Sequence, residues 1–331
     1  MLRYILAILA LCLLPLSVAN ATDCTGGTPA HTCYWILGTG TMDLATDSAH
    51  WSLTTGGATC TCEPSSTDAI VFDASSGVAG ATFTVTPNAT VNVTNFTFGA
   101  CTGTTTGCII DFTTHNNNVN IVNAGGTSNF SGTGTGTRNL KMGTGTWTVG
   151  SNASASNLSV NFSNTSGLTF SGASAPLVLV GANSGSTNLY FGGKSWGPLT
   201  ITGTATYPAT TFQFENGTPS SDTFASLTIN APAFIVFRFS QTFTFTSGIT
   251  VNGASWSAPV YLSSDSNNNN QQATLASGAV ASFGYAVLHN ITGATSTITV
   301  NPAVDLGSNG GTLSLTSPGT GGGGGFIIGG G

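Results

Sequence analysis

The chain has 331 residues, of which 40% are hydrophobic and only 5% are charged, and its formal net charge is -6. Ordinary soluble domains carry about 25% charged residues, so Thr, Ser, Asn and Gly must supply most of the polarity of this protein. Apart from Arg3 the basic residues are Arg138, Lys141, Lys194 and Arg238. They are too few to neutralise a phosphate backbone, and this excludes nucleic-acid binding.

Residues 1–21 have the pattern of a secretory signal peptide. Arg3 supplies the positive charge, an apolar run follows from about Ile5 to Val18, and Ala19-Asn20-Ala21 is a small-x-small cleavage pattern. The apolar run is short compared with the ~20 residues of a membrane-spanning helix. We therefore expect a secreted or cell-surface protein that has no transmembrane segment after cleavage behind Ala21.

Residues 22–80 are expected to form an N-terminal cap module. This segment contains Trp35 and Trp51, two of the five tryptophans of the chain, and we expect both indoles to cover the first turn of a repetitive fold. Its aspartates would keep the outer face hydrated. A calcium site is the alternative role for these aspartates, although their spacing matches no calcium loop; they are Asp43, Asp47, Asp68 and Asp73. The sequence predicts no other cofactor.

The cysteines that follow residue 21 are expected to form disulfides, because they are even in number and belong to a secreted chain. They are Cys24, Cys33, Cys60, Cys62, Cys101 and Cys108. Cys101 and Cys108 flank a short loop and are expected to pair. Cys60 and Cys62 would each meet Cys24 or Cys33, in an order that stays open. The alternative is a metal site built from His31 and the nearby thiolates.

Residues 81–317 consist of short segments with the period-2 alternation of β-strands. Three phrases are nearly identical: PLTITG at 198–203, SLTINA at 226–231 and GITVNG at 248–253. A repeat of this length predicts an all-β, single-stranded parallel β-helix, or β-solenoid, in which like strands stack. With a strand spacing of about 4.8 Å, roughly ten coils would form a rod on the order of 50 Å long. Tandem β-sandwiches are the alternative fold.

Two further features accompany these coils. Asn230 and Asn252 end two of the repeated phrases and are expected to stack as an amide ladder in a turn. Residues 318–331 are rich in glycine and are expected to form a flexible tail. The apolar residues within this tail offer an alternative, the addition of a strand to a neighbouring molecule.

The N-terminal motif resembles a module of secreted bacterial and phage β-helix surface proteins. The residues that carry it are Tyr34-Trp35, Gly38-Thr39-Gly40, Trp51-Ser52, Gly56-Gly57, Pro64 and Asp68–Asp73. A second similarity to the closing coils of such proteins covers residues 251–311. Met42 departs from the pattern, where a third tryptophan is common, and so do the cysteines. The resemblance implies an envelope, extracellular or virion-surface role and brings no catalytic residues.

The sequence offers little for catalysis. Glycoside hydrolysis usually needs two neighbouring carboxylates, and the most plausible pair in the coils is Glu215 with Asp222. The few aromatic residues near turns suit stacking against a neutral sugar instead, or simply burial in coil corners; the candidates are Trp196, Tyr207 and Trp256.

We therefore expect a non-catalytic structural or adhesin-like protein with carbohydrate or a cell surface as its partner. A homo-oligomer is compatible with this expectation. The alternatives are a carbohydrate-active β-helix enzyme, either a glycoside hydrolase or a lyase, and a phage virion or tail-fibre component.

Overall fold

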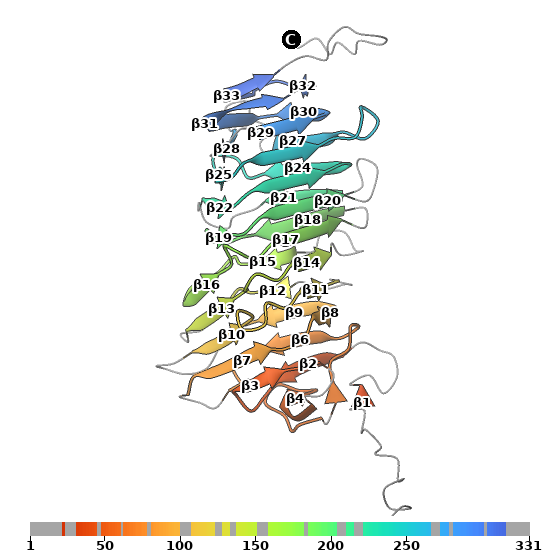
Figure 1. Ribbon diagram of the computed structural model, residues 1–331, viewed down its shortest axis with the longest axis vertical. Helices are drawn as coiled ribbons and strands as arrows, with labels where there is room; N and C mark the ends of the chain where they lie inside the picture. Colours follow the sequence, from red (N-terminus) through yellow and green to blue (C-terminus); the bar gives the residue numbers. More distant parts are fainter. Residues whose placement is uncertain are drawn as a thin grey trace, which may run out of the picture.

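The computed structural model describes residues 22–23, 31–44, 48–60, 62–77, 81–99, 107–122, 128–132, 137–150, 158–181, 185–203, 210–214, 221–265, 272–277, 281–300 and 303–315. These residues form β-strands joined by turns, and their one helical segment is the single 3-10 turn η1 (Ser48–His50). No helix within these ranges is long and apolar enough to cross a membrane. The protein is all-β, as the sequence predicts (Figure 1).

The strands form two small and two large sheets. The two-stranded sheet contains β1 (Thr22–Asp23) and β5 (Cys62–Glu63). The five-stranded sheet contains β3 (Gly40–Met42), β7 (Phe83–Pro87), β10 (Cys108–Asp111), β13 (Arg138–Lys141) and β16 (Leu168–Ser171). The 12-stranded sheet contains, in spatial order, β4 (Trp51–Ser52), β2 (Thr32–Trp35), β6 (Ala69–Phe72), β9 (Asn95–Phe98), β12 (Ser128–Asn129), β15 (Leu158–Asn161), β18 (Gly185–Tyr190), β21 (Thr210–Phe214), β24 (Ala233–Phe237), β27 (Val260–Ser264), β30 (Ala286–His289) and β32 (Ala303–Asp305).

The 14-stranded sheet consists of two series of strands that meet at β31 (Ile291–Val300). The first series is β8 (Val91–Val93), β11 (Val119–Ile121), β14 (Trp147–Gly150), β17 (Leu177–Gly181), β20 (Leu199–Gly203), β23 (Leu227–Asn230), β26 (Ile249–Asn252) and β29 (Ala281–Gly284). The second is β19 (Ser195–Trp196), β22 (Asp222–Phe224), β25 (Thr242–Phe245) and β28 (Ala273–Ser277), and β33 (Gly310–Leu315) pairs with β31 off this path.

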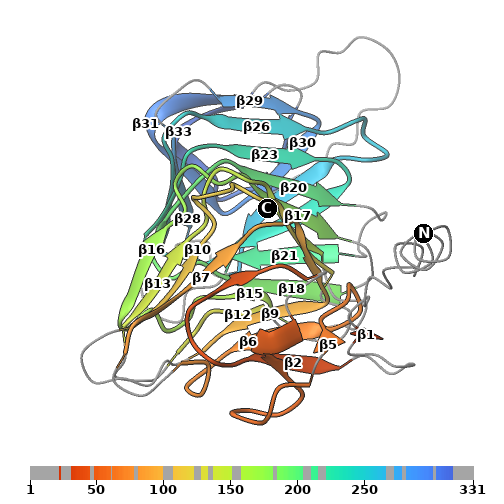
Figure 2. The ribbon, with the colours of Figure 1, turned by 60° about the horizontal axis from the view of Figure 1, so that its bottom comes forward.

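From β6 to β18 consecutive strands lie in different sheets, and from β6 to β28 each strand except β16 pairs in parallel with the strand three places further along the chain. Thus β7 pairs with β10, β8 with β11 and β9 with β12. A parallel bridge between Gly172 and Trp196 continues the five-stranded sheet towards β19. Figure 2 shows the sheets arranged around one interior. Long parallel sheets with this strand order are compatible with a β-solenoid and differ from the antiparallel sheets of β-sandwiches.

The register of the three repeated phrases agrees with the prediction. Leu199 pairs with Leu227, which pairs with Ile249. Ile201, Ile229 and Val251 form the next inward row, and the members of both rows are at most 2% exposed. Because side chains alternate across a strand, the residues between these rows face outward. The predicted amide ladder also forms: Asn252 Nδ2 donates to Asn230 Oδ1 at 2.9 Å.

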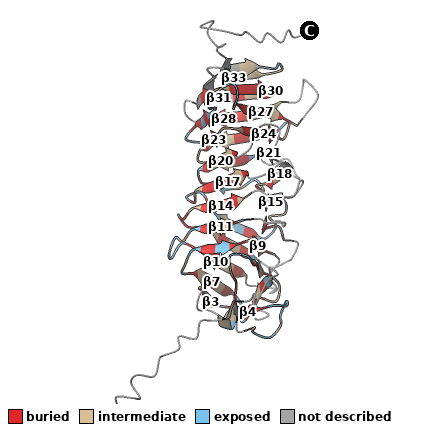
Figure 3. Cartoon of the chain, turned by 90° about the vertical axis from the view of Figure 1, so that its right-hand side faces the viewer, coloured by how far each residue is buried: buried red, intermediate tan, exposed pale blue. Residues whose placement is uncertain are grey.

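Buried rings stack through the first half of the interior. The ring centroids of Phe72 and Phe96 are 5.6 Å apart, those of Phe96 and Phe130 5.4 Å, and those of Phe130 and Phe162 4.6 Å. Figure 3 shows buried residues repeating along the whole stack of strands. A small cavity of about 10 Å³ beside Phe162 is lined by apolar side chains. It offers a water molecule no polar partner.

The expected boundary between cap and coils at residues 80 and 81 does not interrupt the sheets. β2 pairs in parallel with β6, and β6 pairs in parallel with β9 on the other side of that boundary. Only the outermost strand of this sheet reverses: β4 pairs with β2 in antiparallel fashion and places Trp51 opposite Trp35. Both indoles are fully buried, with ring centroids 5.2 Å apart and ring planes perpendicular.

Candidate functional site

Of the two carboxylates predicted to serve glycoside hydrolysis, the structure describes only Asp222. Asp222 is 1% exposed, and its Oδ1 accepts the backbone N–H of Gly193 at 2.8 Å. Its role in that contact is to hold a turn. Glu215, the predicted partner of Asp222, lies outside the described residues. The pair therefore stays a prediction.

Of the four aspartates expected to hydrate the outer face of the cap, with a calcium site as the alternative, two have well-defined roles in turns. Asp68 is fully buried, which corrects its expected place on the hydrated face, and it accepts the backbone N–H groups of His31 and Ser65 at 2.7 and 2.8 Å. Asp73 accepts the N–H of Ser75 at 2.8 Å. Asp43 is half-buried and Asp47 lies outside the described residues. Within the described ranges, no three His, Cys, Asp or Glu side chains gather as a metal site would require.

The cysteines follow the predicted pattern only in part. Cys33 is a buried thiol in β2 and is not half of a disulfide, which corrects its predicted pairing with Cys60 or Cys62. The alternation of β2 turns this side chain into the core. Cys60 and Cys108 are disulfide-bonded. The structure does not describe the side chains of Cys24, Cys62 and Cys101. The predicted pairing of Cys101 with Cys108 therefore stays a prediction.

Trp196 is not the surface residue that a sugar contact requires. Only 3% of it is exposed, its Nε1 donates to the carbonyl of Phe191 at 3.2 Å, and its ring packs edge to face on Phe162 with centroids 4.9 Å apart. This corrects its assignment as a glycan-contact residue and leaves the corner-packing alternative. Tyr207 lies outside the described residues.

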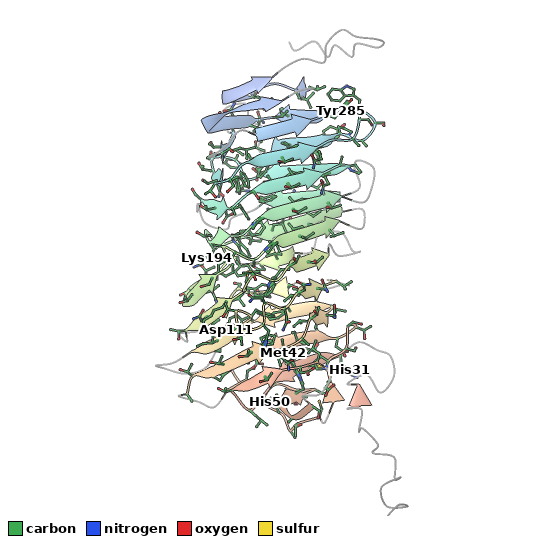
Figure 4. The ribbon with its side chains drawn as sticks, viewed as in Figure 1. His31, Met42, His50, Asp111, Lys194 and Tyr285 are labelled. Atoms are coloured by element: carbon green, nitrogen blue, oxygen red, sulfur yellow. The ribbon has the colours of Figure 1, made fainter. Side chains whose placement is uncertain are left out.

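Trp256, the third predicted contact, is 40% exposed and meets a second aromatic ring. Its ring lies 5.3 Å from that of Tyr285, with an interplanar angle of 83°. Trp256 belongs to the turn between β26 and β27, and Tyr285 precedes β30 in the next coil. Figure 4 labels Tyr285 towards the C-terminal end of the ribbon. We call Trp256 and Tyr285 the corner pair.

The backbone of two neighbouring turns brings the rings of the corner pair together. Residues 254–258 form a tight hairpin, in which Ala254 donates to the carbonyl of Ala258 at 3.1 Å. Gly253, which precedes it, donates to the carbonyl of Gly284 at 2.9 Å. A Cβ atom at Gly253 would lie 2.7 Å from the Cβ of Tyr285, so glycine is required for this approach. Tyr285 itself has a φ of 47°, which is rare for a bulky residue and typical of positions that the surrounding structure holds in place.

The surroundings of the corner pair are polar but uncharged. Ser255 and Ser257 flank Trp256, and their hydroxyl oxygens lie 2.7 Å apart. Residues 251–264 and 281–304 contain no Asp, Glu, Lys or Arg. Aromatic faces beside neutral hydroxyls suit a ligand with both apolar faces and hydroxyl groups.

Arg138 is a structural residue that the sequence analysis did not single out. It is 2% exposed, and burial lowers the pKa of its guanidinium from the usual value. Nη1 donates to the carbonyls of Phe98 and Phe130 at 2.9 and 2.6 Å, and Nη2 to those of Asn164 and Ser166 at 3.3 and 3.4 Å. These carbonyls belong to three successive coils, which one side chain therefore ties together. The alternation of the segment RNLK, which turns Arg138 and Leu140 the same way, is the available sequence signal.

Comparison with protein-family models, with curated proteins and with solved structures finds no match to this chain.

Proposed function

We propose that the chain is a β-solenoid that acts outside the cell or on its surface as a structural or adhesin-like element, without catalysis. The observation that carries this proposal is that apolar side chains fill the interior. Inward rows such as Leu199, Leu227 and Ile249 fill it with apolar side chains from coil to coil. Such an interior stabilises a long body and leaves contact with partners to the outer faces.

The outer faces support the same proposal because their polarity comes from amides and hydroxyls. Asn120 Nδ2 donates to Asn92 Oδ1 at 2.8 Å, and Asn161 Nδ2 to Asn129 Oδ1 at 3.1 Å. These ladders repeat the contact between Asn252 and Asn230 on other coils. They hold adjacent strands together on the hydrated side, as an exposed rod needs.

A surface-labelling experiment tests the location. The full chain, tagged at its C-terminus, is produced in a bacterial host together with a variant that begins at residue 22. We expect the full chain in the medium or accessible to a membrane-impermeant label on intact cells, and the variant only inside. Retention of both forms inside the cell would contradict the proposed location.

An activity assay separates the structural proposal from the enzyme alternative. The purified chain is incubated with a panel of neutral and uronate-containing polysaccharides, and released reducing ends and ultraviolet-absorbing unsaturated products are measured. We expect neither product. Their appearance, and their loss in Glu215→Gln or Asp222→Asn, would establish the enzyme instead.

A further inference from the structure

An outer aromatic surface extends from the corner pair along the 12-stranded sheet. The register aligns Phe234 of β24 with Tyr261 of β27, and Tyr261 with Val287 of β30. The rings of Phe234 and Tyr261 lie 5.8 Å apart at an interplanar angle of 69°. Phe234 and Tyr261 are half-buried and alternate with buried neighbours in β24 and β27, so their side chains face outward. Val287, the next residue in register, is buried and ends this row. We call Phe234, Tyr261 and the corner pair the aromatic strip.

The corner pair lies beside this row. Tyr285 is two residues before Val287, and Trp256 is five residues before Tyr261. Parallel strands are about 4.8 Å apart, so the members of the row follow one another across the strands, along the direction in which the coils stack. The strip therefore presents several rings in succession and not a single exposed aromatic.

Neutral polar groups border the strip on the same face. Ser263 is the next outward residue of β27, and the register aligns it with His289 of β30 and, through Val236, with Gln213 of β21. Thr211 continues the row beyond Phe234. The strands β21, β24, β27 and β30 carry no Asp, Glu, Lys or Arg, and the charges that follow β24 and β27 are paired with each other, Arg238 with Asp265 at 2.8 Å.

From these observations we propose that the aromatic strip binds a neutral polysaccharide chain laid across strands β24, β27 and β30. The apolar C–H faces of the sugar rings stack on Trp256, Tyr285, Tyr261 and Phe234, while their hydroxyls exchange hydrogen bonds with the bordering serine, threonine and glutamine side chains. The strip itself carries no cation, and Arg238 behind β24 is paired with Asp265, which disfavours uronates, nucleic acids and anionic lipid as ligands. This inference rests on the proposed adhesin-like function and gives it a ligand class and a location.

The test is affinity electrophoresis of the purified full chain in gels that contain β-1,4-glucan, α-glucan or mannan, with polygalacturonate as the anionic comparison. We expect at least one neutral polymer to retard the chain and polygalacturonate to have no effect. Because no ion pair takes part, retardation should persist in high salt. Failure of every neutral polymer would overturn the site, whereas the surface-labelling experiment would still decide the proposed location.

Matched variants locate the binding. Trp256→Ala and Tyr261→Thr should each weaken binding by about 10-fold, the loss of one stacked ring, while Tyr285→Phe, which keeps the ring, should bind normally. Val122→Ala is the control, because Val122 is 55% exposed in a different sheet region. Circular dichroism checks that each variant is folded. Full binding by both Trp256→Ala and Tyr261→Thr would place the ligand elsewhere and overturn the inference. Self-association through the strip would also overturn the inference. Sedimentation would detect it as an association of the wild-type chain that both variants abolish.

Discussion

At the scale of single residues, Arg138 is the most consequential polar group of the interior. Its guanidinium donates to carbonyls of three coils and has no carboxylate among the contacts described above. A Cβ at Gly132 would lie 2.7 Å from Arg138 Cζ, so the glycine provides the space that the side chain occupies. Arg138 thus replaces an apolar residue at a position that Cys108 and Leu168 occupy in the adjacent strands.

We expect Arg138→Ala to lower the free energy of unfolding by about 3 kcal/mol, because it empties a buried volume and leaves carbonyl acceptors without donors. Chemical denaturation monitored by circular dichroism measures the change. The matched control is Arg238→Ala. The Arg238 side chain is 42% exposed and bonds Asp265 at 2.8 Å, so its loss should cost at most about 1 kcal/mol. Equal effects of the two substitutions would contradict the role assigned to Arg138.

The ion pair between Asp111 and Lys141, 2.7 Å long, predicts a pH dependence of stability. Burial alone raises the pKa of Asp111, but hydrogen bonds from Lys141 and Thr113 outweigh it, and the net pKa lies below the usual value. The ionised form is therefore the more stable one in the folded chain. Its contribution is present above the unfolded pKa of about 3.9 and is lost as the pH falls through the lower folded pKa.

Asp111→Asn should accordingly reduce the stability at pH 7 by up to about 1 kcal/mol, since Lys141 is partly exposed and solvent screens the pair. The difference between variant and wild type should narrow as the pH falls below about 3.9. Urea unfolding at a series of pH values measures it. A difference that stays constant into acid would show that the ionised carboxylate is not responsible.

At the scale of elements, the repeated phrases carried enough information to predict the register of β20, β23 and β26. Hydrophobic alternation identifies the inward rows, and similarity between phrases identifies which strands stack. The burial of Trp196 could not be predicted in the same way. A tryptophan flanked by turn residues and glycines occurs both in buried corners and on surfaces. Tyr285 was missed because its partner Trp256 lies one coil away, and that offset follows from loop lengths that no local pattern encodes.

The inward rows predict a large difference between neighbouring residues of β23. Leu227→Ala removes a side chain 1% exposed and should destabilise the protein by about 2–5 kcal/mol. Thr228→Ala, on the outer side of the same strand, should change stability by about 0.5 kcal/mol or less. Thermal and urea unfolding of the two variants side by side measure both values. Similar losses at both positions would contradict the inward assignment of Leu227.

At the scale of the whole molecule, the N-terminal end differs from the rest. Trp35 donates from Nε1 to the carbonyl of Gly38 at 2.7 Å, and its ring stacks on His50 with centroids 4.7 Å apart. The antiparallel strand β4 covers the edge that β2 would otherwise expose. Unpaired sheet edges promote association with other strands, so this end fits the role of a cap.

Stability in stacked folds is approximately a sum of local and nearest-neighbour contributions. Trp51→Ala should therefore accelerate hydrogen exchange of the amides of β2, β4 and β6 by at least 10-fold, and leave those of β24 and β27 nearly unchanged. Hydrogen exchange read by mass spectrometry on peptides from both regions measures this. Uniform acceleration along the chain would show instead that the whole protein unfolds as a single unit.

The scarcity of basic residues also limits where proteases of trypsin-like specificity can cut. Behind residue 21 only Arg138, Lys141, Lys194 and Arg238 offer a cleavable bond. The first two belong to β13, which is paired on both sides by β10 and β16, and a protease needs its target segment locally unfolded. Lys194 and Arg238 lie outside strands, so a protease of this specificity should first cut the native protein at these two positions.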